Sequence, residues 1–300
     1  MTRKAFGKAL MEIGADERVF VIDTDVCVST GTTDFRNKYP ERFVQAGIAE
    51  QNAVGIGAGL AATGKIPFVV SYACFLCNRG CDQIMMSVAY PGSNVRICGT
   101  HGGIGVGPDG PTHHAITDIG LMRMLPGMTV VQPADDNEAV AVTRAALGFR
   151  GPLYIRLTRQ QLPGLPVHEF RIGSGVVMRE GRDVSIIATG SMLHPALEAA
   201  ERLSKEGVSA EVINIHTIKP IDVKLILKTA GKTGRVVTCE DHGIGGLYSA
   251  VSEILSEHLP VPMKGVYVRG FADSGTHEEL YSTYGLTAGG VIKAVKEIKR

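Results

Sequence analysis

The sequence carries almost no excess charge of either sign. Its 31 Lys and Arg against 30 Asp and Glu leave a formal net charge of +1, so no basic field favours nucleic acid or an anionic membrane. Long hydrophobic runs are also missing. The longest apolar region, 53–77, is broken by Gly64 and Pro67 and predicts a buried helix and strand rather than a membrane span. With no apolar signal-peptide segment at the N-terminus, we predict a cytoplasmic protein with no nucleic-acid or membrane partner.

Cysteine is too sparse for a disulfide framework, with six in 300 residues. Three of them, Cys74, Cys77 and Cys81, follow a C-x2-C-x3-C spacing that could hold a metal or an iron–sulfur cluster. However, these positions share one face of a helix, no fourth ligand is near in the sequence, and free cysteine is commonly a small buried hydrophobe. We therefore predict buried cysteines and no metal ligand, with a cysteine-cluster module as one non-enzymatic alternative.

Short apolar runs alternate with helix-length segments throughout the chain. This alternation predicts an α/β fold of two mainly parallel-sheet domains. The predicted strands are 19–23, 67–71, 94–98, 129–132, 153–157, 184–188, 210–214, 235–238 and 266–268.

The two sets of strands are separated by a break, RQQLPGLPVHEFRI, which has two prolines, one glycine and no periodicity. The predicted divisions are a first domain at 1–160, a linker at 161–172 and a second domain at 173–300. In the second domain, 190–207 has the apolar spacing of an amphipathic helix. The segment after Glu240, DHGIGGLYSAVSEIL, begins rich in glycine, becomes helical and holds no obvious catalytic set. We expect a structural or interface domain.

The segment 99–113, GTHGGIGVGPDGPTH, contains six glycines and two prolines. Such a composition predicts a loop, because glycine permits positive φ and proline fixes turns. The loop holds three polar groups, His101, Asp109 and His113. Loops on rigid elements often carry catalytic residues, although a surface loop without function is the alternative.

Glu50 lies near the start of a second unusual segment, FVQAGIAEQNAVGIGAGLAATG, which begins at Phe43 as a short strand and continues as a helix. The helix is apolar on all sides and is therefore expected to be buried, with Gly55 and Gly59 allowing close approach of another backbone. A buried carboxylate is costly unless it is protonated or paired with one basic partner. Glu50 is therefore a candidate acid/base group, or a structural carboxylate.

Taken together, these motifs resemble the C-terminal half of a transketolase, in the form encoded as two separate subunits. The resemblance covers essentially all 300 residues. It rests on GTHGGIGVGPDGPTH and AGIAEQN, followed in order by LPGMTVVQPADDNEA and IRLTRQQLP. It implies that the first domain is the pyrimidine-binding domain of thiamine diphosphate enzymes and that the second is the transketolase C-terminal domain.

The resemblance also implies roles at the cofactor. Glu50 matches the glutamate that bonds the aminopyrimidine N1′ and favours the tautomer whose N4′ nitrogen removes the thiazolium C2 proton. Tyr72 and Phe75 match aromatic positions against the pyrimidine ring. His101 and His113 match catalytic and substrate-facing positions in the loop, and Asp109 matches a reader of a sugar hydroxyl.

Further positions match the family's binding site for the sugar phosphate. These are Arg3, Ser29 and Arg159, and an arginine fork suits a phosphate dianion. Asp25 matches a position near the site without an assigned role.

One family motif is missing from the chain. Transketolases hold the diphosphate and its metal with Gly-Asp-Gly and a later Asn, and no Gly-Asp-Gly occurs in these 300 residues. The resemblance therefore implies a partner: an N-terminal subunit that carries this motif, binds Mg²⁺ (or Ca²⁺ or Mn²⁺) through the diphosphate, and forms an α2β2 heterotetramer.

The expected function is transfer of a two-carbon ketol unit from a ketose phosphate to an aldose phosphate. Alternatives with the same fold are half of a deoxyxylulose-phosphate synthase and the β subunit of a 2-oxoacid dehydrogenase. A subunit that only scaffolds its partner is a further non-enzymatic alternative. The physiological sugar is left open between an ordinary pentose phosphate, a branched sugar and a sulfonated one.

Overall fold

Buried apolar runs form two sheets in the computed structural model, which describes residues 1–299. The larger sheet has seven strands in the order β10-β5-β6-β4-β3-β1-β2. Neighbouring strands are parallel except at one edge, where β10 runs antiparallel to β5. The strands are β1 (Val19–Asp23), β2 (Phe43–Gln45), β3 (Ile66–Tyr72), β4 (Arg96–Thr100), β5 (Thr129–Val131), β6 (Leu153–Arg156) and β10 (Thr217–Lys219).

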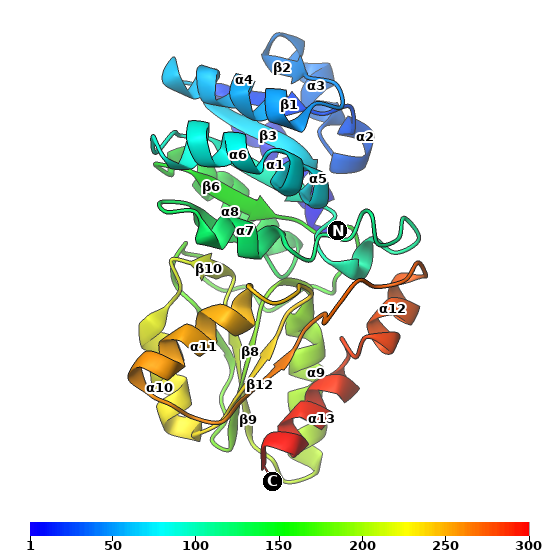
Figure 1. Ribbon diagram of the computed structural model, residues 1–300, viewed down its shortest axis with the longest axis vertical. Coiled ribbons are helices and arrows are strands. Elements are labelled where there is room, and N and C mark those ends of the chain that lie inside the picture. The colour runs from blue at the N-terminus through cyan, green and yellow to red at the C-terminus, as the bar shows by residue number, and fades with distance from the viewer. Residues whose placement is uncertain (300) are drawn as a thin grey trace.

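The smaller sheet has five strands in the order β12-β11-β8-β9-β7. It is also parallel except for β7, which pairs antiparallel with β9 at the edge. The strands are β7 (Val176–Arg179), β8 (Val184–Ala188), β9 (Ala210–Asn214), β11 (Val236–Cys239) and β12 (Met263–Val266). The two sheets lie one beyond the other along the long axis of the molecule (Figure 1).

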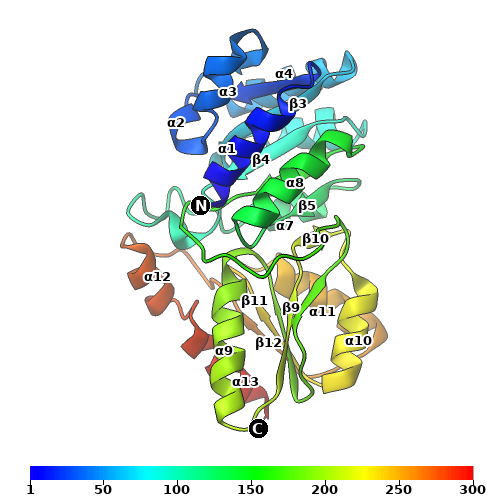
Figure 2. The ribbon, with the colours of Figure 1, turned by 180° about the vertical axis from the view of Figure 1, so that it is seen from behind.

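Helices cover both faces of the larger sheet, as strands buried on both sides require. One face packs against α1, α3 and α8, which lie in front in Figure 2, and the other against α4, α5, η2 and α7. The elements of this domain are α1 (Thr2–Ile13), α2 (Cys27–Thr30), α3 (Thr33–Lys38), η1 (Pro40–Arg42), α4 (Glu50–Ala62), α5 (Ala73–Arg79), α6 (Cys81–Gln83), η2 (Ile84–Ala89), η3 (Ile104–Val106), α7 (Asp118–Met124) and α8 (Asp136–Gly148).

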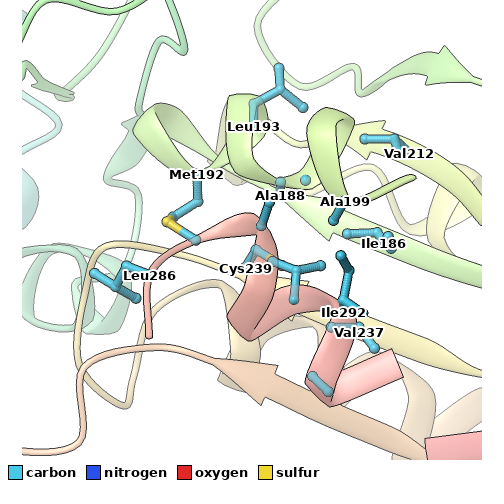
Figure 3. Close-up of a cluster of buried hydrophobic side chains, with 14 of the residues drawn as sticks. Ile186, Ala188, Met192, Leu193, Ala199, Val212, Val237, Cys239, Leu286 and Ile292 are labelled. Atoms are coloured by element: carbon cyan, nitrogen blue, oxygen red, sulfur yellow. The ribbon is translucent and has the colours of Figure 1, made fainter. Parts of the chain in front are cut away.

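The smaller sheet is likewise covered on both faces. Its larger core joins α9 and α13 to the sheet and includes Leu193, Ala199 and Val237 (Figure 3). On the opposite face, α10 and α11 pack against the same strands. The elements are η4 (Gly190–Met192), α9 (Leu193–Lys205), α10 (Val223–Thr233), α11 (Leu247–His258), α12 (His277–Thr283) and α13 (Ala288–Lys299).

The predicted architecture of two mainly parallel α/β domains is confirmed, as is the amphipathic helix, which is α9. All nine predicted strands have counterparts, although β4 and β12 are displaced by two or three residues from the expected ranges. The strands β7 and β10 were not predicted. Both are short, antiparallel and at a sheet edge, where a strand needs no long apolar run.

The expectation that α4 is buried on all sides is wrong for this chain. Its Ala53 and Val54 are fully buried, but Gly55 and Gly59 face outward. A Cβ at either glycine would meet nothing within 4 Å in the described residues, so no other backbone of this chain approaches them. None of the helices within 1–299 has the length and hydropathy needed to span a membrane.

Candidate active site

The predicted site residues gather at the carboxyl edge of the larger sheet. β3 ends at Tyr72, which is opposite Thr100 at the end of the neighbouring β4, and β6 ends three residues before Arg159. Parallel strands present their carboxyl ends at one edge, which is where open α/β sheets bind ligands. The edge therefore collects segments that are far apart in the sequence.

Glu50 is the first residue of α4 and is only 4% exposed. Both carboxylate oxygens contact one nitrogen of Arg79, at 3.1 and 3.3 Å from Nη1. The Arg79 side chain is half exposed, and its guanidinium lies over the Phe75 ring at 4.3 Å. Glu50 and Arg79 line an open cavity of about 610 Å³ with Ile48. Glu50 thus has the single basic partner that its burial required.

Four rings form a cluster beside this ion pair. Phe75 and Tyr72 stack at 5.9 Å between centroids, and Tyr72 contacts His101 at 4.0 Å. His113 makes T-shaped contacts with both aromatic residues, at 5.0 Å from Phe75 and 6.2 Å from Tyr72 between ring centroids. The structure therefore brings together both predicted aromatics and both predicted histidines. Their assigned roles stay predictions.

His101 is held in one tautomer by its neighbours. Its Nε2 lies 3.3 Å from Nη1 of Arg3, which can only donate. The Nδ1 hydrogen therefore points to the Thr100 hydroxyl oxygen at 2.8 Å, and that hydroxyl donates to the carbonyl of Ser71. Burial, with Arg3 and Arg159 nearby, lowers the pKa of His101 to about 3, so the ring is neutral at neutral pH.

The predicted phosphate-binding residues lie around His101. Arg3 also donates to the backbone carbonyl of Ser29, so Ser29 contributes a backbone oxygen here and not its hydroxyl. Arg159 donates to Asp109 at 3.0 Å and to a loop carbonyl, so two residues that were assigned separate sugar contacts pair with each other. Burial and the charge of Arg159 lower the pKa of Arg3, which shows that two cations share this region. Asp25 is exposed, with a left-handed φ of 68°.

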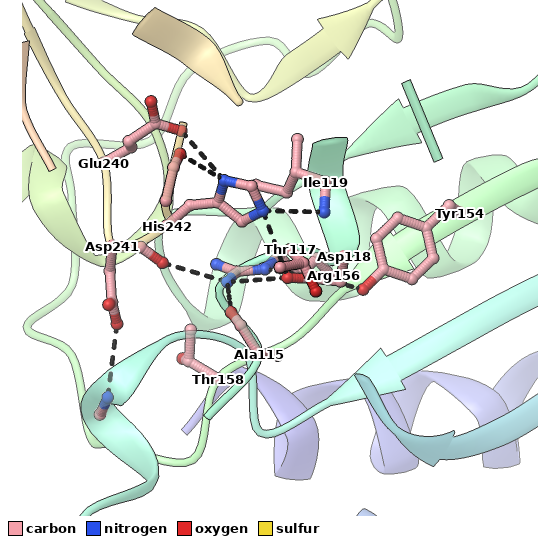
Figure 4. A network of polar contacts seen from close by, with 12 residues as sticks. Ala115, Thr117, Asp118, Ile119, Tyr154, Arg156, Thr158, Glu240, Asp241 and His242 are labelled. Atoms are coloured by element: carbon pink, nitrogen blue, oxygen red, sulfur yellow. Dashed lines mark hydrogen bonds and ion pairs between the residues drawn. The ribbon is translucent and has the colours of Figure 1, made fainter. Parts of the chain in front are cut away.

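A buried polar network joins the two domains behind the loop (Figure 4). The side chain of Arg156 is fully buried and pairs with Asp118 at 2.7 Å. It also donates to the backbone carbonyl of Asp241 in the second domain at 3.0 Å. His242 Nε2 accepts from the backbone N–H of Ile119, and burial lowers the pKa of His242 to about 4.

The family of the chain follows from comparison with known sequences. Residues 1–164 match the family described as "Transketolase, pyrimidine binding domain", and residues 173–291 match "Transketolase, C-terminal domain". The chain belongs to the transketolase family.

Relatives in this family are similar along nearly the whole chain. A "6-deoxy-6-sulfo-D-fructose transketolase subunit SqwH" of Clostridium sp. (strain MSTE9) is 42% identical over 94% of this chain and 89% of its own. One of the subunits of an apulose-4-phosphate transketolase, from Phocaeicola vulgatus, is 37% identical over 98% of this chain and 96% of its own. The "1-deoxy-D-xylulose-5-phosphate synthase" of Desulfotalea psychrophila is 37% identical over 98% of this chain but only 47% of that protein.

A solved structure has the same fold. It is described as "Split gene transketolase, inactive beta4 tetramer" and superposes with a TM-score of 0.92 at 44% identity, covering 99% of this chain and 97% of that one. The predicted relationship to subunits of split transketolases is therefore confirmed.

Transketolases depend on thiamine diphosphate, and the residues at this edge fit the pyrimidine end of that cofactor. Glu50 is a buried carboxylate whose two oxygens share a single donor nitrogen, so acceptor capacity remains for a ring N–H. Phe75 lies against Arg79, the ion-pair partner of Glu50, and stacks with Tyr72, so two aromatic rings lie beside the ion pair. The described residues contain no group of three or more metal-ligating side chains.

Several site residues were not found by sequence reasoning. Arg79 lies 29 residues from Glu50, and nothing in its local sequence marks it as an ion-pair partner. Asp241 lies in a segment judged to hold no catalytic set, yet it follows directly on the carboxyl end of β11, as Glu240-Asp241-His242. Three polar residues directly after a parallel strand lie at the edge where such sheets bind ligands, and this pattern could have marked Asp241 as a candidate. Cys74 and Cys77 are buried as predicted, whereas Cys81 is partly exposed and lies on a separate short helix.

Proposed function

We propose that this chain is one of two subunits of a thiamine diphosphate-dependent transketolase that moves a two-carbon ketol unit from a ketose phosphate to an aldose phosphate. The proposal is carried by one observation. The buried Glu50, the stacked Phe75 and Tyr72, and the loop histidines form one continuous group of contacts at the sheet edge.

Each part of this group has a role in the proposed reaction. Bound thiamine diphosphate would supply the carbon nucleophile and the electron sink that ketol transfer requires. Glu50 would share a proton with N1′ of the aminopyrimidine, at a site where burial keeps water from competing. Phe75 would present its ring to the pyrimidine. His101, neutral and fixed in its tautomer, and His113 would face the reacting end of the sugar.

A partner chain would supply the remaining half of the site. It would carry the Gly-Asp-Gly motif and hold Mg²⁺, Ca²⁺ or Mn²⁺ against the diphosphate. The similar solved structure is described as an inactive tetramer of one chain type, which supports an active assembly that contains a second chain type. An α2β2 heterotetramer is the arrangement that we propose.

The cations near the loop favour a sugar with an anionic end. Burial and then the charge of Arg159 lower the pKa of Arg3, and a phosphate or sulfonate would offset the repulsion between the two cations. The named substrates of two relatives are a sulfonated and a phosphorylated sugar. Similarity to deoxyxylulose-phosphate synthases over 98% of this chain supports that synthase half as the second candidate.

Donor specificity tests the proposal. The chain is mixed with a partner chain that carries Gly-Asp-Gly, together with thiamine diphosphate and magnesium. It is then assayed with ketose phosphates, a 6-sulfonated ketose and a 2-oxoacid, each with an aldose phosphate acceptor. We expect two-carbon transfer from a ketose. Carbon dioxide release from the 2-oxoacid, without transfer from any ketose, would support the synthase instead.

Arg159→Ala is expected to raise KM for phosphorylated donors by about tenfold to a hundredfold, because a charge-assisted hydrogen bond contributes roughly 1.5–3 kcal/mol. Hydroxypyruvate has no remote phosphate, so its KM should change much less. Asp109→Asn removes the charge of the 3.0 Å partner but leaves the guanidinium in place, so it separates loss of the ion pair from loss of the phosphate ligand. Equal losses with both donors would show that Arg159 binds no phosphate.

A further inference from the structure

The second domain reaches into the first at the substrate loop, 101–113. Asp241 accepts hydrogen bonds from the backbone N–H of Ile104 at 2.9 Å and, more weakly, of Gly105 at 3.4 Å. The Ser274 hydroxyl donates to the carbonyl of Pro108 at 2.7 Å. The central turn η3 is therefore tied to the C-terminal domain, beside which the loop lies in Figure 1.

The loop is also tied to its own domain, through Arg3 and Arg159 and through two backbone hydrogen bonds. Gly102 donates to the Leu157 carbonyl and Gly103 to the Ala115 carbonyl. Gly103 has a φ of 83°, and a Cβ there would overlap the Asp241 carboxylate. The absence of a side chain is what allows the carboxylate to approach the backbone this closely.

Asp241 is itself held rigidly in place. Its side chain is fully buried, and Oδ2 accepts a hydrogen bond from Tyr281 of α12 at 2.7 Å. That phenol is held by Gln160 at 2.7 Å and by Ser191 at 2.9 Å. The backbone carbonyl of Asp241 accepts from Arg156. Because both its side chain and its backbone are held by hydrogen bonds, Asp241 can determine the position of the backbone amides that its carboxylate binds.

We propose that Asp241 is a positioning residue through which the C-terminal domain sets the conformation of the substrate loop, and hence the placement of His101, Asp109 and His113. The inference rests on the proposed function for its kinetic consequence, but its structural content concerns this chain alone. In this role the second domain helps to position residues that bind substrate, besides forming its own hydrophobic core.

The neighbouring residue provides a matched control. Glu240 is also fully buried and accepts two backbone hydrogen bonds, from Leu247 at 2.7 Å and Tyr248 at 2.8 Å. Both donors belong to the second domain, at the start of α11. Glu240→Gln and Asp241→Asn therefore make the same chemical change at adjacent buried positions, and only Asp241 contacts the loop.

The first experiment is amide hydrogen exchange on the full chain without cofactor or partner. Asp241→Asn replaces one acceptor oxygen by an NH₂ group. A group that donates to that oxygen in the wild type would therefore face the amide NH₂, which is itself a donor. We expect exchange at 102–113 to rise by at least about tenfold, because hydrogen bonds to charged groups are among the stronger ones. Glu240→Gln should instead raise exchange at 247–258 and leave the loop unchanged.

A milder variant, Tyr281→Phe, removes the hydrogen bonds of the phenol to Oδ2, Gln160 and Ser191 and keeps the Ile104 contact. It should raise loop exchange by a smaller factor, and it carries the test if Asp241→Asn fails to fold. The proposal would be overturned if the loop exchanged as slowly in Asp241→Asn as in the wild type. If Asp241→Asn does not fold, the same outcome in Tyr281→Phe would overturn it. An equal rise in Glu240→Gln would also overturn it.

The second experiment uses the assembled enzyme. Asp241→Asn should lower kcat/KM for the preferred ketose by at least about tenfold, with cofactor affinity unchanged, while Glu240→Gln stays within about threefold at a similar loss of Tm. Absence of ketol transfer by the wild-type assembly would contradict the proposed function but leave the exchange result standing. If Asp241→Asn weakened cofactor binding but left hydrogen exchange in the loop unchanged, the positioning role would be contradicted.

Discussion

Glu50→Gln is expected to remove most turnover from the assembled enzyme, by about 10²–10⁴-fold, the usual contribution of a general acid–base group. Glutamine fills the same volume at this buried position but cannot share a proton with a ring nitrogen. The expected loss is in kcat at saturating thiamine diphosphate. Steady-state rates measured alongside cofactor titration by fluorescence separate this loss from weaker binding.

The ion pair with Arg79 offers a direct control. If Glu50 served only that 3.1 Å contact, Arg79→Gln would reduce activity as much as Glu50→Gln does. If Glu50 acts on the cofactor, Arg79→Gln should retain activity within about tenfold, since general acid–base catalysis is intact. A Glu50→Gln enzyme within about threefold of the wild-type rate would assign Glu50 a structural role.

Local pattern was enough to predict most of the fold. Parallel strands buried on both faces appear as continuous apolar runs, so β1, β3 and β8 are visible in the sequence. The edge strands β7 and β10 lack this property. The strand β10 also crosses from the second half of the chain to pair with β5, and such a pairing depends on tertiary packing rather than on a local pattern.

The candidate site was predicted only in part, because local sequence marks some of its residues and not others. Glu50 and the glycine-rich loop stand out because their composition conflicts with ordinary packing. Their partners do not: Arg79 is one arginine among the 31 basic residues of the chain. Asp241 contacts Ile104 across 137 residues. Contacts of this kind follow from how two domains dock, which no local periodicity encodes.

The isolated chain is expected to show no ketol transfer, and addition of the partner chain should produce it. The chain has no Gly-Asp-Gly motif to hold the diphosphate. Beside the Glu50 cavity, Ile48 is 77% exposed, and α4 turns Gly55 and Gly59 outward with open space above them. We expect the partner chain to cover this exposed face, so that the site is completed by association.

Mixing experiments with two glutamate variants test this expectation. Gly59→Glu places a charge on the outward face of α4 without steric conflict, because nothing lies within 4 Å of the added Cβ, and replacement of glycine within a helix favours folding. It should keep the wild-type circular dichroism and Tm but lose association and activity. Gly148→Glu, at the exposed end of α8 and equally unobstructed, should retain both. Full activity of the isolated wild-type chain would refute the two-subunit enzyme, whereas normal assembly of Gly59→Glu would refute only the role of α4.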